Sequence, residues 1–437
     1  MKRAVIIFAA GQGTRMKSAI PKVLHTIAHK AMLHYVIDLA QSLSPEQVVI
    51  ICSPFLKDYL EKNAASLGID RSNLTLTVQD PPKGTGHAMQ VGIDALHNDI
   101  DEVIVLYGDV PLVKKETLSP LLADPADICF VSMRVAPPHA YGRIITYGTI
   151  VKRIVEFKDA TENERAIDLV WSGVLKSKVS FLKDFLPKIP AAPNTGEYYL
   201  THLAVMAGME GRSASYVEAP DADEFEGVND KAALSQMESR KQCELRAKFL
   251  NNGVKLIAPE TVFFAHDTVI GEDVTIEPFV TFGKGVILGQ GSLIRSFCHI
   301  EDSIIEENVH IGPFAHLRGH NHIENDATIG NFVEVKKSRL SKGAKAKHLA
   351  YLGDAEIGAD ANIGAGAITC NYDGHKKHKT IIGARSLVGV NATLIAPLTI
   401  GDDSVVGAGS VITDDVPSKT LALARSRQTI KERHLKK

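Results

Sequence analysis

A six-residue repeat is the feature that most restricts how this chain can fold. Between about residues 254 and 424 an aliphatic residue or Phe recurs at every sixth position, and Gly often follows it directly. A short period sustained over this length is typical of a solenoid. Six residues per flat face and three faces per coil predict a triangular β-helix with the repeated side chains pointing inward. The series comprises Ile270, Ile276, Phe282, Leu288, Ile294, Ile300, Ile305, Ile311, Leu317, Ile323, Ile329, Val335, Ile357, Ile363, Ile382, Val388, Leu394, Ile400, Val406 and Ile412.

The composition agrees with a narrow prism. Only 6% of the residues are aromatic, whereas 34 are Gly and one is Trp. We expect the interior to be too narrow for aromatic rings, and the small residue at each corner to permit a tight turn. A β-sandwich is the alternative, but its turn signals would come every 8–12 residues without this regularity.

The region before the repeat alternates between strand and helix signals up to about residue 228. Residues 48–52 and 102–109 contain short β-branched apolar runs, and residues 4–9 form a further strand candidate. Between the strand candidates at 4–9 and 48–52, Lys30–Ser42 has the apolar spacing of a helix, with Leu33, Val36, Ile37 and Ala40 on one face. This alternation predicts an α/β domain with a mostly parallel sheet covered on both faces.

A single helix is predicted to join these two regions. Residues 229–252 contain no Gly or Pro and are rich in helix formers. Asn229 is a candidate N-cap, and Asn251-Asn252-Gly253 is a candidate stop signal. We therefore expect domains at 1–228 and 253–437, the second including a C-terminal tail, with a linker helix at 229–252.

The charge balance and the cysteines restrict the partners and the compartment. Lys and Arg number 49 and Asp and Glu 51, so there is no basic excess for nucleic-acid binding. No apolar run approaches the roughly 20 residues that span a bilayer, so we expect no membrane partner. The N-terminal apolar stretch is too short for a signal peptide. Five scattered cysteines show neither zinc nor disulfide spacing. These features favour a cytoplasmic protein.

A glycine loop follows the first strand. In Gly11-Gln12-Gly13-Thr14-Arg15, the glycines would let backbone N–H groups approach a phosphate, and Arg15 adds a charged fork. The loop matches neither the Walker pattern nor the complete dinucleotide-binding pattern. By itself this short motif is equally consistent with a tight turn.

Longer matches make the assignment more specific. The glycine loop together with Pro21-Lys22-Val23-Leu24 resembles the signature of sugar-nucleotide pyrophosphorylases. Further matches follow in order and continue through the repeat region, so nearly the whole chain resembles the bacterial bifunctional N-acetylglucosamine-1-phosphate uridyltransferase/glucosamine-1-phosphate acetyltransferase family. In the first region these matches are Gln79, Gly84-Thr85-Gly86-His87-Ala88, Tyr107-Gly108-Asp109, Tyr141-Gly142-Arg143, Glu156 and Glu226-Gly227-Val228-Asn229.

The resemblance implies a fold, an assembly and two reactions. It implies a Rossmann-like nucleotidyltransferase domain and a left-handed parallel β-helix of hexapeptide repeats; this handedness cannot be inferred from the period alone. It also implies a homotrimer formed through the β-helix. The β-helix domain would acetylate glucosamine-1-phosphate from acetyl-CoA. The N-terminal domain would then join N-acetylglucosamine-1-phosphate to uridylate from UTP and release pyrophosphate, yielding a precursor of peptidoglycan and lipopolysaccharide.

For the uridyltransferase reaction, the resemblance implies a set of N-terminal residues. Asp109 and Asn229 would bind Mg²⁺, a cation that prefers oxygen ligands. Arg15 and Lys22 would act catalytically on the triphosphate and the sugar phosphate. Gln79, Gly84 and Thr85 would bind uracil, and Gly142 and Glu156 would contact the sugar. Further substrate contacts are expected at Phe8, Ala9, Ala10, Gly11, Tyr107 and Gly108.

One residue departs from the family pattern in this domain. The family usually has Asn-(Thr/Ser)-Gly where this chain has Trp171-Ser172-Gly173. Indole offers one hydrogen-bond donor and no acceptor. If the register is right, Trp171 occupies the sugar-contacting position and alters that contact. The alternative is that Trp171 turns into the core and a neighbouring residue serves the sugar.

For the acetyltransferase reaction, the implied residues lie in and around a polar interruption of the repeat. His348 would be the base that removes the ammonium proton. Residues 371–379 cannot continue the hexads and are predicted to protrude as a loop. Two departures occur: Arg318 is followed by Gly319-His320 instead of Pro-Gly, and Val390 replaces a Ser near acetyl-CoA. The substrate contacts would be Arg318, Lys336, Tyr351, Asn362 and Lys377, and the acetyl-CoA contacts Ala365, Asn371, Tyr372, Ala408 and Arg425.

Two further hypotheses stay open at this point. Trp171 could have impaired the uridyltransferase, or Val390 the acetyltransferase, leaving one activity. Alternatively, the protein could be a non-catalytic nucleotide-sugar sensor or scaffold. That class should lose its chemical residues first, yet Asp109, Asn229, Arg15 and His348 are all present.

Overall fold

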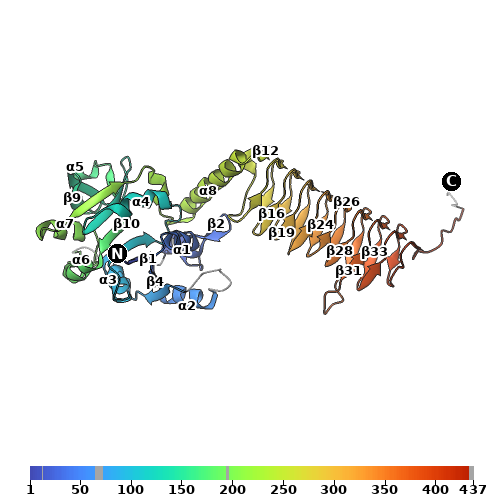
Figure 1. The fold of residues 1–437 in the computed structure, drawn as a ribbon, viewed down its shortest axis with the longest axis horizontal. Coiled ribbons are helices and arrows are strands. Elements are labelled where there is room, and N and C mark those ends of the chain that lie inside the picture. Colours follow the sequence, from blue (N-terminus) through green and yellow to red (C-terminus); the bar gives the residue numbers. More distant parts are fainter. Residues whose placement is uncertain (12, 64–71, 193–195, 433–437) are drawn as a thin grey trace, which may run out of the picture. The chain divides into compact units, whose positions relative to one another are not determined.

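A computed structural model describes residues 1–437 except 12, 64–71, 193–195 and 433–437. The chain forms two compact units, Met1–Met237 and Glu238–Lys437, which are described separately (Figure 1). The predicted glycine loop includes Gln12, and the predicted C-terminal tail includes residues 433–437, both outside the described part. Within the described part, no helix is long and apolar enough to cross a membrane.

The first unit is built on a nine-stranded sheet in the order β5-β4-β1-β6-β10-β7-β11-β9-β8. The strands β5, β4, β1 and β6 run parallel, as the sequence predicts. The other half mixes directions because β10 lies antiparallel between β6 and β7. The strands are β1 Arg3–Ala9, β4 Gln47–Cys52, β5 Leu74–Val78, β6 Glu102–Tyr107, β7 Ile128–Arg134, β8 Arg143–Tyr147, β9 Ile150–Val155, β10 Leu169–Lys178 and β11 Ala214–Glu218.

Apolar residues on both faces of this sheet are buried. Ala4 and Ile6 of β1 belong to one hydrophobic cluster, while Val5 and Ile7 belong to another, because successive strand residues point to opposite faces. Helix α1 (Met32–Ser42) buries the four apolar residues that its spacing predicts. The other helices of this unit are α2 Pro54–Asn63, α3 Thr85–Asp94, α4 Lys115–Ala123, α5 Glu162–Arg165, α6 Val179–Phe185 and α7 His202–Met209.

Helix α8 spans Lys231–Asn251, close to the predicted range. The prediction of Asn229 as its N-cap is wrong: Asp230 caps the helix, its carboxylate accepting a hydrogen bond from the Ala233 backbone N–H at 2.9 Å. The predicted stop is correct. Gly253 has φ 83°, and the Val254 N–H reaches back to the Phe249 carbonyl at 3.0 Å. This geometry ends helices because Gly adopts the left-handed conformation without strain.

The second unit is a prism of three stacked parallel sheets, the triangular β-helix predicted from the repeat, with the left-handed form that the family resemblance implies (Figure 1). We name each face after one of its strands. The β26 face contains β12 Lys255–Leu256, β14 Thr275–Ile276, β17 Leu293–Ile294, β20 His310–Ile311, β23 Thr328–Asn331, β26 Lys345–His348, β29 Asn362–Ile363, β32 Leu387–Val388, β35 Val405–Val406 and β37 Leu421–Ala422.

The other two faces have eight strands each. The β24 face contains β15 Thr281–Phe282, β18 His299–Ile300, β21 His316–Arg318, β24 Glu334–Lys336, β27 Tyr351–Gly353, β30 Ile368–Cys370, β33 Thr393–Ile395 and β36 Val411–Ile412. The β25 face contains β13 Val269–Ile270, β16 Val286–Leu288, β19 Ser303–Ile305, β22 Asn321–Ile323, β25 Arg339–Leu340, β28 Ala355–Ile357, β31 Thr380–Ile382 and β34 Leu398–Ile400.

The repeated apolar residues fill the prism as predicted. All twenty hexad residues are buried except Ile270, which is half-buried in the first strand of the β25 face. Each stacks on its equivalent in the next coil; Leu317, for example, is the register partner of Val335. The hexad pattern therefore identifies the core residues of this unit.

The explanation expected for the corner glycines holds for some of them, such as Gly291 and Gly366 with φ near 70°, but not for all. Gly330 and Gly364, which follow hexad residues, do not have positive φ. A Cβ atom on Gly330 would lie 1.8 Å from the Lys347 carbonyl oxygen, and one on Gly364 would lie 2.6 Å from that of Val388. These glycines are needed because the next coil approaches their backbone closely. Left-handed backbone occurs at other corner positions, which are occupied by Gly or by residues such as Asp302 and Asn308.

Aromatic rings are not excluded from the prism, contrary to expectation. Phe264 and Phe282 stack inside its first coils, with ring centroids 5.3 Å apart and nearly parallel planes. Four other phenylalanines stack on the outside at 4.8–5.1 Å and are about half exposed. We call this column, Phe279, Phe297, Phe314 and Phe332, the phenylalanine ladder.

The interruption predicted at residues 371–379 is a protruding loop between β30 and β31 (Figure 1). Tyr372 and Lys377 form an isolated antiparallel bridge across it. The Asp373 carboxylate accepts hydrogen bonds from the backbone N–H groups of His375 and Lys376 and pairs with His378. These contacts hold the pKa of Asp373 well below its usual value. The stacking of coils resumes when β31 pairs with β28.

Candidate functional sites

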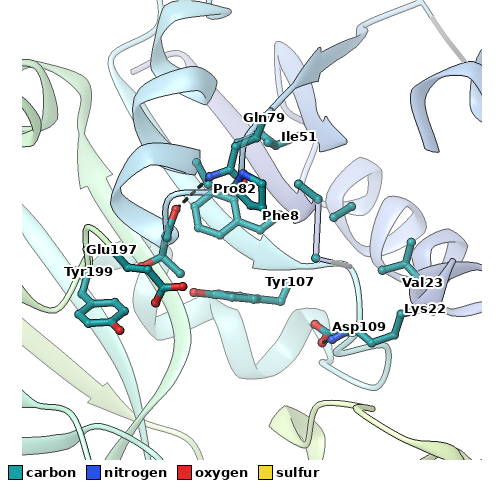
Figure 2. Close-up of a pocket in the computed structure, with 16 residues that line it drawn as sticks. Phe8, Lys22, Val23, Ile51, Gln79, Pro82, Tyr107, Asp109, Glu197 and Tyr199 are labelled. Carbon is teal, nitrogen blue, oxygen red and sulfur yellow. Dashed lines mark hydrogen bonds and ion pairs between the residues drawn. The ribbon is translucent and has the colours of Figure 1, made fainter. Parts of the chain in front are cut away.

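A cavity of about 390 Å³ lies at the carboxyl ends of β1 and β6 (Figure 2). Clefts at this edge of an open α/β sheet commonly bind ligands. Figure 2 shows Lys22 and Asp109 on one side of the cavity, with Glu197 and Tyr199 on the other. The lining residues are Phe8, Ala9, Ala10, Gly11, Lys22, Val23, Ile51, Gln79, Pro82, Gly84, Thr85, Ala88, Tyr107, Asp109, Glu197 and Tyr199.

The loop after β1 brings Lys22 to this cavity. The backbone of Gly13 has φ 59°, and a Cβ there would lie 2.6 Å from the Cβ of Lys22. Gly13 therefore allows the short 3-10 helix Thr14–Met16 to pack closely on the segment that carries Lys22. On the neighbouring strand, the Gly108 N–H donates to the Phe8 carbonyl at 2.9 Å, which aligns the ends of β1 and β6.

The ammonium group of Lys22 forms two polar contacts. It pairs with the Asp109 carboxylate and donates to Oδ1 of Asn229 at 3.2 Å. The side chains of Lys22 and Asp109 are only 13% and 15% exposed. The Val228 N–H donates to the Asp109 carbonyl at 3.0 Å, which brings the neighbouring Asn229 to the end of β6. Two oxygen acceptors from distant segments thus converge on one cation.

A second wall of the cavity is formed by two segments joined through their backbones. The Gly86 N–H donates to the Tyr198 carbonyl at 2.7 Å, and the Tyr198 N–H donates to the Lys83 carbonyl at 2.9 Å. Gly84 has φ 94°, and a Cβ there would lie 2.6 Å from the Tyr198 carbonyl oxygen. Only Gly can occupy this position without moving the 197–200 segment.

Gln79 lies on this wall and is almost fully buried. Its Nε2 donates to the Gly84 carbonyl at 3.0 Å and lies 3.2 Å from Nδ1 of His87 (Figure 2 draws the first contact). An amide nitrogen has two hydrogens, and these two acceptors can use both. The carbonyl oxygen Oε1 is then the atom of Gln79 available to accept a hydrogen bond from a ligand.

Aromatic side chains form the floor of the cavity. Phe8 and Tyr107 pack edge to face, with ring centroids 5.3 Å apart. Burial, with smaller contributions from the Asp109 and Glu156 carboxylates, raises the pKa of Tyr107 far above its usual value. Tyr107 therefore presents a neutral hydroxyl group at any physiological pH.

Glu156 and Gly142 lie close together but are not among the residues that line this cavity. A Cβ on Gly142 would lie 3.8 Å from Oε2 of Glu156 and 3.8 Å from Thr201. Burial raises the pKa of Glu156 above its ordinary value, although a hydrogen bond with Thr201 acts in the opposite direction. Burial thus makes the charged carboxylate of Glu156 less favourable than that of an exposed Glu, while Thr201 stabilises it.

The cavity unites ten of the residues predicted for the uridyltransferase reaction. These are Phe8, Ala9, Ala10, Gly11, Lys22, Gln79, Gly84, Thr85, Tyr107 and Asp109. Asn229 joins them through Lys22, whereas Arg15 is exposed on its 3-10 helix. Glu197 and Tyr199 were not predicted. The signal was present: Gly196-Glu197-Tyr198-Tyr199 places two adjacent aromatic residues in a chain poor in them.

Trp171 is in the core, which is the second of the two alternatives that the sequence left open. It lies in the core of the first unit, 8% exposed, and packs edge to face on Phe130 at 5.8 Å. Its indole N–H donates to the Val174 carbonyl at 3.0 Å, so its single donor is used within the chain. An irregularity in the pairing of β10 with β7 lies between Trp171 and Leu175, within the same strand.

In the second unit, four predicted residues gather at the ends of strands on the β24 face. Arg318 and Lys336 are register partners, and Gly353 follows in the next coil. A Cβ on Gly353 would lie 2.5 Å from the Tyr351 hydroxyl and 2.7 Å from Nδ2 of Asn371. Arg318 is held by Glu334, whose carboxylate accepts at 2.6 and 2.9 Å. We call Arg318, Lys336, Tyr351 and Asn371 the cationic cluster.

His348 lies at the end of β26, where the chain turns toward the β24 face. Its Nδ1 is 2.7 Å from Oδ1 of Asn331, its register partner in the preceding coil. Because an amide oxygen can only accept, Nδ1 is the donor, and in the neutral ring it is Nε2 that has the lone pair. The sequence alone did not identify Asn331, since its contact with His348 depends on the coil register.

Three of the predicted acetyl-CoA residues, Ala365, Ala408 and Arg425, continue the column that contains His348. Ala346, Ile363, Val388 and Val406 are successive register partners. Two residues beyond each of them stand His348, Ala365, Val390 and Ala408. Arg425 joins this column by donating from Nη1 to the Ala408 carbonyl at 2.9 Å.

Three predicted residues lie elsewhere on the prism. Asn362 is on the β26 face, as the register partner of Lys345 and Leu387. Tyr372 and Lys377 are on the protruding loop, where the Lys377 ammonium lies 5.2 Å from the centre of the Tyr372 ring. One prism therefore distributes the predicted acetyltransferase residues over two faces, a corner and a loop.

Comparisons with known protein families identify both units. The MobA-like NTP transferase domain matches residues 5–168. The bacterial transferase hexapeptide matches residues 267–302 and 302–337, and the hexapeptide repeat of succinyl-transferase matches residues 379–414. These matches agree with the α/β sheet of the first unit and the stacked coils of the second.

Curated relatives match nearly the whole chain. The bifunctional protein GlmU of Zymomonas mobilis is 43% identical over 440 residues, covering 99% of this chain and 97% of the relative. Those of Azorhizobium caulinodans and Paracoccus denitrificans are 43% and 42% identical, each match covering 98% of this chain and 95% of the relative. The chain therefore belongs to the bifunctional GlmU family, whose two activities are the uridyltransferase and the acetyltransferase indicated by its motifs.

Proposed function

We propose that the cavity of the first unit carries out uridylyl transfer and that the corner and faces near His348 carry out acetyl transfer. The enzyme acetylates glucosamine-1-phosphate and then joins the product to uridylate. The observation that best supports this assignment is the convergence of ten motif residues on one cavity. The individual roles below follow from the chemistry of each side chain.

In uridylyl transfer, a phosphate oxygen of N-acetylglucosamine-1-phosphate attacks the α-phosphorus of UTP, and the bond to the pyrophosphate leaving group breaks. Both reactants are anions, so positioning and charge neutralisation dominate catalysis. We assign this neutralisation to Lys22 and Arg15. Backbone N–H groups of the loop from Ala9 to Gly11 would bind phosphate oxygens. Gln79, Gly84 and Thr85 would bind uracil, and Gly142 and Glu156 the sugar.

Mg²⁺ fits the two oxygens at the end of β6. The Asp109 carboxylate and Oδ1 of Asn229 already converge on one cation, the Lys22 ammonium. Carboxylate and amide oxygens are hard ligands of the kind that Mg²⁺ prefers, and Mg²⁺ commonly has only one or two protein ligands besides phosphates and waters. When bound, Mg²⁺ would offset the charge of the triphosphate. Lys22 would then be released from its two oxygen partners and be free to contact phosphate.

In acetyl transfer, the amine of glucosamine-1-phosphate attacks the thioester carbonyl of acetyl-CoA, the C–S bond breaks, and the proton that the new amide nitrogen loses converts the CoA thiolate to the thiol. The amine must first lose its ammonium proton. We propose that Nε2 of His348 takes it while Asn331 holds the ring. Arg318 and Lys336 of the cationic cluster would bind the sugar phosphate, with Lys377 approaching from the loop. Acetyl-CoA would lie along the column of Ala365 and Ala408, near Asn371, Tyr372 and Arg425.

We further propose a homotrimer in which neighbouring prisms complete each acetyltransferase site. Asn362 is on the β26 face and Lys336 on the β24 face, and outward side chains on two faces of a triangular prism diverge. One substrate could contact both residues only if a second prism supplied one of them. The exposed phenylalanine ladder offers an apolar surface along which prisms could pack.

Separate assays of the two half-reactions test the assignment of the two activities. His348→Ala should lower CoA release by about 10²- to 10⁴-fold, the usual contribution of a general base, without changing pyrophosphate release. Asp109→Asn should lower pyrophosphate release without changing CoA release. His310→Ala, on an exposed residue of the β26 face, is the matched control. If the wild-type protein shows only one of the two activities, the single-activity alternative is supported. If it shows neither, the non-catalytic scaffold is supported.

Removing Lys22 should strengthen the binding of a free divalent cation. Lys22→Met removes an ammonium group that competes for Asp109 and Asn229, so Mn²⁺ affinity without nucleotide should rise about tenfold. The affinity for UTP should fall. Electron paramagnetic resonance of free Mn²⁺ measures the first effect and calorimetry the second. Lys57→Met on α2 is the control. Unchanged or weaker Mn²⁺ binding would contradict the metal site.

Trp171→Phe distinguishes a core residue from a sugar contact. If Trp171 is a core residue, this substitution should lower the free energy of unfolding of the first unit by about 1–3 kcal/mol, because a hydrogen bond and some packing are lost. KM for N-acetylglucosamine-1-phosphate should change less than twofold. Circular dichroism must follow unfolding, since Trp171 is the only tryptophan. Phe130→Leu should behave alike. A large rise in KM at unchanged stability would identify a sugar contact.

Mixed trimers test whether neighbouring prisms share a site. Lys336→Ala and Asn362→Ala should each lower acetyl transfer strongly. After unfolding and refolding together in equal amounts, about a quarter of the sites should regain both residues if they come from different copies. Lys336→Ala mixed with Arg318→Ala is the control, because these register partners lie on one copy and should give no recovery. Absence of recovery in trimers of confirmed mass would place Asn362 and Lys336 in one copy's site.

A further inference from the structure

His87 is the one polar residue of the Gly84-Thr85-Gly86-His87-Ala88 motif to which the proposed reaction assigns no role. It lies in the first turn of α3, and Gln79 precedes that helix on the same wall of the cavity. Its Nδ1 is 3.2 Å from Nε2 of Gln79. Because an amide NH₂ group can only donate, Nδ1 is the acceptor in this contact, and the ring proton lies on Nε2.

Two acceptors fix the orientation of the Gln79 amide. Nε2 donates to His87 on one side and to the Gly84 carbonyl at 3.0 Å on the other. The backbone of Gln79 is also held, since its N–H donates to the Cys52 carbonyl at 3.0 Å. Rotating the amide by 180° would place Oε1 against the Gly84 carbonyl and would break both hydrogen bonds; the contact with His87 would return only if the ring proton moved from Nε2 to Nδ1. The buried side chain therefore presents an acceptor, Oε1, as its remaining polar atom.

The pyrimidines differ at the atom that such an acceptor would meet. Uracil has an N–H donor at N3, whereas cytosine has an unprotonated acceptor at N3 and an amino group at C4. A fixed Oε1 could accept from uracil N3–H but would face the lone pair of cytosine N3. A freely rotating amide could adapt to either base, because it would offer its NH₂ group to cytosine.

We propose that His87 is a positioning residue for base selection: its contact with Gln79 holds the amide with Oε1 as the available acceptor, which favours UTP over CTP. This inference rests on the proposed function, in which Gln79 binds the base. His87 acts through Gln79 and is assigned no contact with the nucleotide. A residue that only packed α3 would affect UTP and CTP binding equally.

Two variants of His87 separate these roles. His87→Leu removes the acceptor and should reduce the ratio of UTP to CTP affinity about 5- to 10-fold, the usual effect of one lost hydrogen bond. His87→Asn retains an acceptor, because Oδ1 of Asn can occupy nearly the position of Nδ1, and should restore the ratio. Titration calorimetry with each nucleotide and Mg²⁺ measures both affinities without depending on catalysis. Circular dichroism checks that each variant is folded.

The outcomes distinguish this inference from the proposed function. Equal weakening of UTP and CTP by His87→Leu would overturn the role of His87 in selection, as would failure of His87→Asn to restore the ratio. If the wild-type protein bound UTP without preference over CTP, the proposed role of Gln79 would itself fail. A Gln79→Leu variant separates the two cases, since it should abolish the preference whether or not His87 positions the amide.

Discussion

The close stacking of each coil on the next is the constraint on which the second unit depends. Parallel backbone hydrogen bonds hold the coils, and at the corners the chain passes so near its neighbour that Gly330 has no room for a Cβ atom. This stacking converts distance along the sequence into proximity in space. Asn331 and His348 are 17 residues apart, yet they become adjacent partners. The same stacking aligns Arg318 with Lys336 and extends the column of His348 through Ala365 to Ala408.

The first unit achieves proximity differently. Its cavity is assembled from loops at one edge of a sheet, and backbone hydrogen bonds join segments far apart in sequence. Gly84 and Gly86 have no side chain, which allows Tyr198 to approach their backbone closely. The 83–86 loop and the 197–200 segment therefore form one wall. At the opposite side, the Asp109 backbone holds Val228, which brings Asn229 to Lys22. Sheet order determines where the cavity lies, and these loop contacts determine which side chains line it.

Periodicity, together with the family resemblance that the motifs carry, predicted much of this arrangement. The hexads identified the prism and its buried residues, and the motifs identified ten residues of one cavity. Contacts that depend on three-dimensional register were not predictable. Asn331 is an ordinary polar residue until the coil stacks, and the core position of Trp171 depends on the local path of β10. Likewise, Asn229 and Asp230 are equally good cap residues by type, and only the helix start shows that Asp230 forms the cap.

The loop at residues 371–379 shows how such a prism can change length. The chain leaves the stack after β30 and returns with β31, and the strand pairings on both sides continue without a gap. An insertion at a corner therefore leaves the pairing of the strands intact. A whole coil could likewise be gained or lost, because each coil contacts only its two neighbours. The length of the prism ahead of Arg318 can thus vary in steps of about 4.8 Å, the spacing of paired strands. Such a change would alter neither the cationic cluster nor the column that contains His348. Evolution can adjust the length of this unit independently of its chemistry.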